Sequence, residues 1–140
     1  MDDLQASRVG KKTIRVLLVD DQPAVRRGLK MRLELEPDVE VIGEAGDGAA
    51  AIARATEVQP DIVLMDVEMP GMDGILATRA LRAAAPHSAV VVLTLYDDGA
   101  TRARAQEAGA AAFVAKHQIE AALLGTMRQV ASGTGEGGTP

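Results

Sequence analysis

The chain has 140 residues, which suits one domain with a single hydrophobic core. Hydrophobic residues make up 47% of it and charged residues 25%, which is the composition of an ordinary globular protein. The net charge of −5 argues against a broad basic surface for nucleic acid. Cysteine is absent from the sequence, so disulfides, thiolate metal sites and a cysteine nucleophile are excluded.

Both ends of the sequence differ in composition from its middle. Residues 1–12 are acidic and polar without the apolar region of a signal peptide, so we expect a flexible N-terminal segment. Residues 132–140 are rich in Gly, Ser, Thr and Pro and predict a flexible linker or tail, which leaves 13–131 as the folded domain. No apolar run is long enough to span a bilayer. We therefore expect a cytoplasmic protein with no membrane contact.

Short aliphatic runs alternate with helical patterns between these ends. In chain order we expect a strand followed by a helix five times over: 13–20 and 23–36, 39–46 and 48–58, 61–66 and 74–85, 88–95 and 99–110, and 111–116 and 118–131. Pro23 suits a helix start and Gly109 a helix end. Strands that are apolar throughout and separated by helices indicate a parallel sheet covered on both faces. The expected fold is a doubly wound five-stranded α/β domain.

Polar side chains stand where four of the expected strands end. Asp20 and Asp21 end the first strand, Asp66 the third, Thr94 the fourth and Lys116 the fifth. The carboxyl ends of parallel strands share one edge of a sheet, so we expect these side chains in one cleft. Two carboxylates about 4 Å apart repel by roughly 4 kcal/mol at an effective dielectric near 20. Such a cluster holds protons or binds a hard cation, and oxygen ligands without His or Cys favour Mg²⁺.

Each of these residues also has a plainer explanation when it is taken alone. Asp20 and Asp21 suit the N-cap of the first helix, and Asp66 suits an Asx turn. Thr94 is consistent with an ordinary strand residue, and Lys116 with a solvated surface lysine. Their coincidence at four strand ends favours a functional site over four unrelated explanations.

Four segments, "LLVDDQPAVRRGL", "DIVLMDVEMPGMDG", "VVVLTLYDD" and "GAAAFVAK", together resemble the receiver domain of two-component response regulators. The resemblance runs from about Thr13 to Ala131. "LTLYDD" and a lysine without a following proline are most similar to the NarL/LuxR-type (FixJ-like) receivers, which usually precede a LuxR-type helix-turn-helix domain. The resemblance implies a flavodoxin-like, CheY-like sheet of order 2-1-3-4-5 flanked by five helices.

The resemblance further implies a phosphoryl acceptor and a metal site. Asp66 would accept a phosphoryl group from a histidine kinase. Mg²⁺ would be bound by the side chains of Asp21 and Asp66, with Asp20 helping through water and Glu68 through its backbone carbonyl. The chain would catalyse only its own phosphorylation and dephosphorylation, and would not be an enzyme for other substrates.

A conformational switch is also implied. Thr94 and Lys116 would contact the phosphoryl oxygens, and Phe113 would turn from exposed to buried as Thr94 moves inward. The affected surface would be formed by helix 99–110, strand 111–116 and helix 118–131, or by the first and last helices. It would serve homodimerisation or output, with DNA bound only through a C-terminal domain missing from this chain.

Three positions depart from the common receiver pattern. His117 stands where the family often has a proline, so we expect a trans Lys116–His117 bond, because a cis bond before a residue other than proline costs roughly 2.5–4 kcal/mol. Leu95 is bulkier than the usual small residue, and this predicts narrower access to Asp66. Phe113 replaces the commoner tyrosine and has no hydroxyl.

Other functions remain as alternatives. A haloacid-dehalogenase-like phosphatase needs an Asp-x-Asp pair on the first strand, whereas "VDDQ" gives adjacent aspartates. A nucleotide- or flavin-binding module needs a glycine-rich phosphate loop, which the first strand lacks. A stand-alone or degenerate receiver that acts only in docking is the third alternative. His87 and His117 are expected on the surface, and Met69 and Met72 in the packing of the loop after Asp66.

Overall fold

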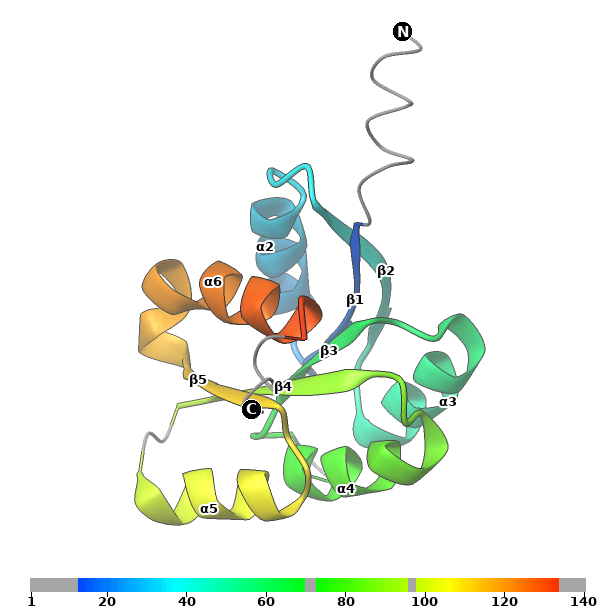
Figure 1. Ribbon diagram of the computed structural model, residues 1–140, viewed down its shortest axis with the longest axis vertical. Helices are drawn as coiled ribbons and strands as arrows, with labels where there is room; N and C mark the ends of the chain where they lie inside the picture. The colour runs from blue at the N-terminus through cyan, green and yellow to red at the C-terminus, as the bar shows by residue number, and fades with distance from the viewer. Residues whose placement is uncertain (1–12, 70–72, 96–97, 134–140) are drawn as a thin grey trace, which may run out of the picture.

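The computed structural model describes residues 13–69, 73–95 and 98–133 (Figure 1). Within them, five strands form one sheet: β1 (Ile14–Val19), β2 (Val39–Ala45), β3 (Ile62–Asp66), β4 (Ala89–Thr94) and β5 (Ala112–Ala115). The helices are α2 (Pro23–Leu33), α3 (Gly48–Val58), α4 (Gly74–Ala84), α5 (Gly99–Glu107) and α6 (Ile119–Ala131), and a 3-10 turn, η1 (Lys116–Gln118), precedes α6. The expected segment 1–12, most of the expected tail and Met72 lie outside the described residues.

The strand order is β2-β1-β3-β4-β5, and every neighbouring pair is parallel. The expected doubly wound sheet of order 2-1-3-4-5 is therefore confirmed. The order reverses between β1 and β3, and sheets of this kind bind ligands beyond the carboxyl ends of the strands at that point. The carboxyl end of β1 leads into Asp20 and Asp21, and β3 ends at Asp66, so acidic residues flank the reversal.

Helices cover both faces of the sheet (Figure 1). On one face α2 and α6 bury Leu33 and Met127 against the strands, and on the other α4 buries Leu81. Each fully buried side chain of this size contributes about 1.5–3 kcal/mol to stability. The core is built from aliphatic, alanine and methionine side chains. Met69, after β3, is buried in it, as expected.

Local chemistry fixes where several helices begin and end. Asp47, Asp73 and Asp98 cap α3, α4 and α5, and each accepts a hydrogen bond from the backbone N–H three residues on, at 2.7–2.9 Å. This contact satisfies one of the amide groups that the first helical turn leaves without an intrahelical partner. Gly109 follows α5 with φ of +97°, so its expected place at a helix end is confirmed.

Most elements are one or two residues shorter than expected, and the first and fourth helices are three residues shorter. The first helix ends at Leu33 because residues 34–38 turn toward β2, and the fourth ends at Glu107. The last strand ends at Ala115 because Lys116 opens the 3-10 turn η1. Helix 48–58 has the expected bounds.

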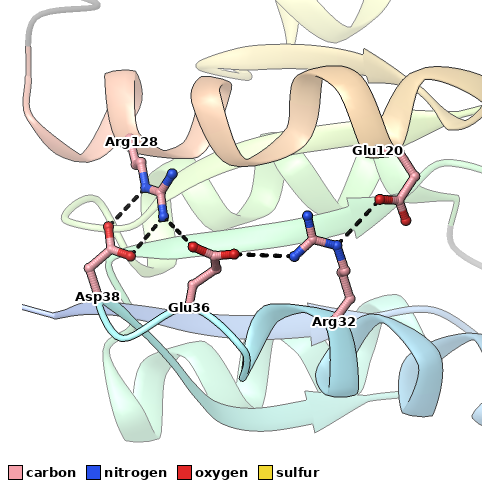
Figure 2. Close-up of polar contacts among 5 residues, drawn as sticks. All are labelled: Arg32, Glu36, Asp38, Glu120 and Arg128. Atoms are coloured by element: carbon pink, nitrogen blue, oxygen red, sulfur yellow. Dashed lines mark hydrogen bonds and ion pairs between the residues drawn. The ribbon is translucent and has the colours of Figure 1, made fainter.

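A network of ion pairs ties α2 and the turn after it to α6 (Figure 2). Arg128 of α6 donates to both carboxylate oxygens of Asp38 at 2.9 Å and to Glu36 at 2.8 Å. Arg32 lies 3.3 Å from Glu36 and from Glu120. Each charged group in this network therefore has a partner of opposite sign, although the three carboxylates outnumber the two guanidinium groups.

Candidate functional site

Three carboxylates gather at the carboxyl edge of the sheet. Asp20, Asp21 and Asp66 each offer an oxygen, and these oxygens all lie within 4.8 Å of one another. Asp20 is 3% exposed and Asp66 2%, whereas Asp21 is half-buried. The strands bring them together: β1 and β3 pair directly in parallel, so residues that follow one strand meet the end of the other.

The Asp66 carboxylate is held from two sides. Lys116 Nζ lies 2.8 Å from Asp66 Oδ1, and the backbone N–H of Glu68 donates to the same oxygen at 3.1 Å. Burial raises the pKa of Asp66 from 3.8 to about 6; Lys116 opposes this rise and the Asp20 charge adds to it. The Glu68 contact is the bond of an Asx turn, so the plainer structural explanation of Asp66 also holds.

Lys116 is directed into the acidic cluster. Burial lowers the pKa of its ammonium, but the hydrogen bond and charge of Asp66, with Glu68 and Asp20 nearby, outweigh burial and raise the pKa above its ordinary value. The Lys116–His117 bond is trans, since no described peptide bond is cis, and this expectation is confirmed. The reading of Lys116 as a solvated surface lysine is wrong, because its side chain is 22% exposed and ion-paired.

This donor set fits a hard divalent cation. The three carboxylates supply oxygen ligands only, and two of them are buried where their negative charges repel. The raised pKa of Asp66 reflects chiefly the loss of hydration on burial, with the Asp20 charge as a smaller contribution. A cation such as Mg²⁺ between these oxygens would remove the repulsion, which the single ammonium of Lys116 offsets only in part.

The side chain of Glu68 joins Thr94 to Lys116. The Thr94 hydroxyl donates to Glu68 Oε2 at 2.6 Å, and the Leu95 N–H donates to Glu68 Oε1 at 3.3 Å. Lys116 Nζ lies 3.4 Å from the same Oε1. Only the backbone carbonyl of Glu68 was expected to matter, and the sequence gives no signal for these side-chain contacts. The Leu95 side chain itself is 61% exposed.

Phe113 is half-buried, between the exposed and the buried positions expected of its ring, so the expected turn of the ring stays a prediction. Arg102 of α5 places its guanidinium 4.2 Å from the centre of the Phe113 ring. Such a cation–π contact covers the ring face and is worth about 0.5–1 kcal/mol at an exposed site. The ring is therefore partly covered at the edge of the core.

Neither Asp20 nor Asp21 caps the first helix, so that plainer explanation is wrong. The N-cap position of α2 is Gln22, which makes no side-chain capping bond. Asp20 Oδ1 instead accepts from the Gln22 N–H at 2.9 Å, and Arg26 Nη1 donates to the Asp20 carbonyl at 2.6 Å. These contacts hold the loop after β1 so that its carboxylates stay at the sheet edge.

Other candidate residues lie away from this cluster. His87 and His117 are exposed, as expected. A hollow of about 520 Å³, lined among others by Thr13, Asp61 and Arg128, opens at the amino ends of the strands, opposite the carboxylates. The chemistry of the carboxyl edge, rather than the volume of a cavity, therefore marks the candidate site. No helix of the described residues has the length and apolar character needed to cross a membrane.

Comparison with known proteins agrees with the geometry. A profile of the response regulator receiver domain matches residues 16–128. The transcriptional regulatory protein LiaR of Bacillus subtilis is 42% identical over 120 residues, which are 86% of this chain and 57% of that protein. A protein-glutamate methylesterase/protein-glutamine glutaminase of Caldanaerobacter subterraneus is 47% identical over 107 residues, 76% of this chain and 29% of that protein.

Solved structures show the same likeness. The signal receiver domain of the response regulator NarL from Mycobacterium tuberculosis superposes with a TM-score of 0.82 at 34% identity, covering 87% of this chain and 98% of that one. The chain belongs to the response regulator receiver domain family of two-component systems. It spans little more than half the length of relatives such as LiaR, which are transcriptional regulators by name.

Proposed function

We propose that Asp66 accepts a phosphoryl group from a histidine kinase in a Mg²⁺-dependent reaction. The observation that carries this proposal is the placement of Asp66: a buried carboxylate beside two others, with Lys116 Nζ 2.8 Å away. A carboxylate nucleophile needs a fixed position and nearby positive charge, because the incoming group is itself anionic.

In the transfer, an Asp66 oxygen bonds to phosphorus while the bond from phosphorus to the donor's imidazole nitrogen breaks. The electron pair of the broken bond stays with the imidazole. Asp21 and Asp66 would hold Mg²⁺ through side chains, with Asp20 helping through water and Glu68 through its carbonyl. When bound, the metal supplies positive charge that offsets the charge of the transferred group. The Lys116 ammonium and the Thr94 hydroxyl would contact phosphoryl oxygens.

The test is phosphoryl incorporation from acetyl phosphate, followed by intact mass and by mapping of the modified peptide. The parent chain should gain one phosphoryl group only when Mg²⁺ is present, and Asp66→Asn should gain none. Asp21→Ala should greatly weaken Mg²⁺ binding, so that phosphoryl incorporation requires more Mg²⁺. Glu40→Gln, which removes an exposed carboxylate from β2, is the matched control and should behave like the parent. Normal incorporation into Asp66→Asn would overturn the assignment.

We propose further that phosphorylation changes the α5–β5–α6 surface, or the α2–α6 surface, for homodimerisation or output. A phosphoryl group adds about −1.5 to −2 charges and draws the Thr94 hydroxyl toward its oxygens. The half-buried Phe113 then turns further inward. A shift from 1:99 to 99:1 between two states takes about 5.5 kcal/mol of differential stabilisation.

Thr94→Ala tests this switch. It should leave phosphorylation largely intact and uncouple it from self-association, because the hydroxyl that senses the phosphoryl group is gone. Phosphoryl content and sedimentation would be measured together, with beryllium fluoride as the activating mimic. Thr56→Ala, on the exposed side of α3, is the control. A parent-like response of Thr94→Ala to the mimic would show that the chain signals in another way.

The output is proposed to be transcriptional, through a DNA-binding domain outside this chain, because LiaR and similar relatives are transcriptional regulators by name. The matched methylesterase indicates that receivers of this sequence type also serve enzymes. For the chain itself we propose catalysis of its own phosphorylation and dephosphorylation only. Turnover of p-nitrophenyl phosphate would favour the phosphatase alternative instead. The cytoplasmic compartment, the limits of the folded domain and the flexible ends stay predictions.

A further inference from the structure

The Glu68 side chain lies close to Asp66, the proposed phosphoryl acceptor, because both carboxylates contact Lys116. Three donors converge on its carboxylate: the Thr94 hydroxyl at 2.6 Å, the Leu95 N–H at 3.3 Å and the Lys116 ammonium at 3.4 Å. The side chain is 25% exposed, so it is partly sheltered from water without being sealed in. A hydroxyl, a backbone amide and an ammonium around one anion form a small anion-binding site, which this chain fills with its own carboxylate.

Two of these donors are the groups that a phosphoryl group on Asp66 would need. Lys116 Nζ lies between Asp66 Oδ1, at 2.8 Å, and Glu68 Oε1, at 3.4 Å, so the two carboxylates share one ammonium. A phosphoryl group bonded to Asp66 brings three acceptor oxygens and further negative charge into this space. It would compete with Glu68 for the hydroxyl of Thr94 and for Lys116, and like charges would repel.

We propose that the Glu68 carboxylate is an internal substitute for the phosphoryl group, which holds Thr94 and Lys116 in the unphosphorylated chain and must leave before phosphorylation can engage them. This inference rests on the proposed role of Asp66 as acceptor. Glu68 thereby lowers the rate of phosphorylation by free anionic donors and stabilises the inactive arrangement of Thr94. It is a positioning residue, since it acts through the donors it holds.

Three substitutions at Glu68 distinguish the effect of its charge from the effect of its size. Glu68→Gln keeps the size but removes the charge that pairs with Lys116, and Glu68→Ala vacates the space. Glu68→Asp keeps the charge on a side chain shorter by one methylene, so it should fall between Gln and the parent. The backbone carbonyl proposed for the metal is present in all three variants. Glu40→Gln removes an exposed carboxylate on β2 and controls for net charge.

The first measurement is the rate of phosphoryl incorporation from acetyl phosphate with Mg²⁺. Glu68→Gln and Glu68→Ala should react about tenfold faster than the parent, which corresponds to about 1.4 kcal/mol, whereas Glu40→Gln should match the parent.

The second measurement is the affinity for beryllium fluoride, read from the NMR signals of Thr94 and Leu95. Affinity should rise by a similar factor. Without any ligand, the Thr94 and Leu95 signals should already move in Glu68→Gln.

The outcomes distinguish the proposed role of Glu68 from the proposed role of Asp66 as phosphoryl acceptor. If the parent takes up phosphoryl on Asp66 but Glu68→Gln and Glu68→Ala react no faster and bind the mimic no better, the role of Glu68 is wrong and the acceptor stands. If the parent takes up none on Asp66, the proposed function fails first. A cooperative thermal transition in each variant shows that it is folded, and if one variant unfolds the other carries the test.

Discussion

Replacement of Asp66 by asparagine should stabilise the metal-free chain at neutral pH. Asp66 is 2% exposed, and burial, together with the Asp20 charge, raises the pKa of its carboxyl from 3.8 to about 6 even though Lys116 opposes the rise. The folded chain therefore binds this proton more tightly than the unfolded chain does. The stability that results is fully present below pH 3.8 and is lost as the pH rises through about 6.

The size of the effect follows from the same two pKa values. A rise from 3.8 to about 6 corresponds to about 3 kcal/mol of destabilisation at pH 7.5, where the carboxylate is charged in both states. The neutral amide that replaces the carboxylate in Asp66→Asn escapes this cost. We expect Asp66→Asn to be more stable than the parent by up to about 3 kcal/mol at pH 7.5. The gain should shrink steadily toward pH 4.

Urea unfolding of both chains from pH 4 to 8, in chelator and without divalent metal, measures the difference directly. Carboxylates distant from Asp66 titrate in both chains, so the difference in unfolding free energy reports Asp66 together with its close neighbours Asp20 and Lys116. Glu40→Gln, which removes an exposed carboxylate on β2, is the control variant. Mg²⁺ at pH 7.5 should stabilise the parent more than Asp66→Asn, because the variant lacks one ligand. A difference that stays flat from pH 4 to 8, or a variant less stable at pH 7.5 without metal, would refute the reasoning.

Three further substitutions test the scaffold of the domain. Gly74→Ala should destabilise by about 3 kcal/mol or more and lower phosphoryl uptake, because a Cβ there would overlap the backbone carbonyl of Asp66. Gly109→Ala should cost about 1–2 kcal/mol, since φ of +97° strains any residue with a Cβ. Arg128→Ala should cost at most about 1 kcal/mol, because the side chain that pairs with Asp38 is 44% exposed. Urea unfolding measures all three.

Each of these three has a matched control. Gly125→Ala places a Cβ in open space on α6 and should not destabilise. An equal loss there would contradict the explanations from steric overlap at Gly74 and from positive φ at Gly109. For Arg128, the measurement is repeated in 0.5 M salt, about the range where exposed charges are strongly screened. A loss that salt leaves unchanged would mean that packing of the side chain stem, not the ion pair, stabilises the α2–α6 contact.

Much of the fold could be predicted from the sequence because its signals are local. Apolar runs marked each strand, and the helix at 48–58 has the bounds its pattern predicts. Gly109 marked a helix end because a positive φ is available to glycine without strain. The meeting of Asp20, Asp21 and Asp66 also followed from the sequence, since parallel strands bring their carboxyl ends to one edge.

Only the tertiary structure decided which side chains share partners across that edge. Glu68 holds Thr94, 26 residues away, and Arg128 pairs with Asp38, 90 residues away. The covered position of Phe113 depends on how α5 places Arg102 over it. Strand and helix periodicities repeat over a few residues and carry no record of such pairs. The Glu68–Thr94 contact forms where the ends of β3 and β4 lie side by side, and the other two form when helices pack. Their distances are therefore set by the packing of the whole domain rather than by any local pattern.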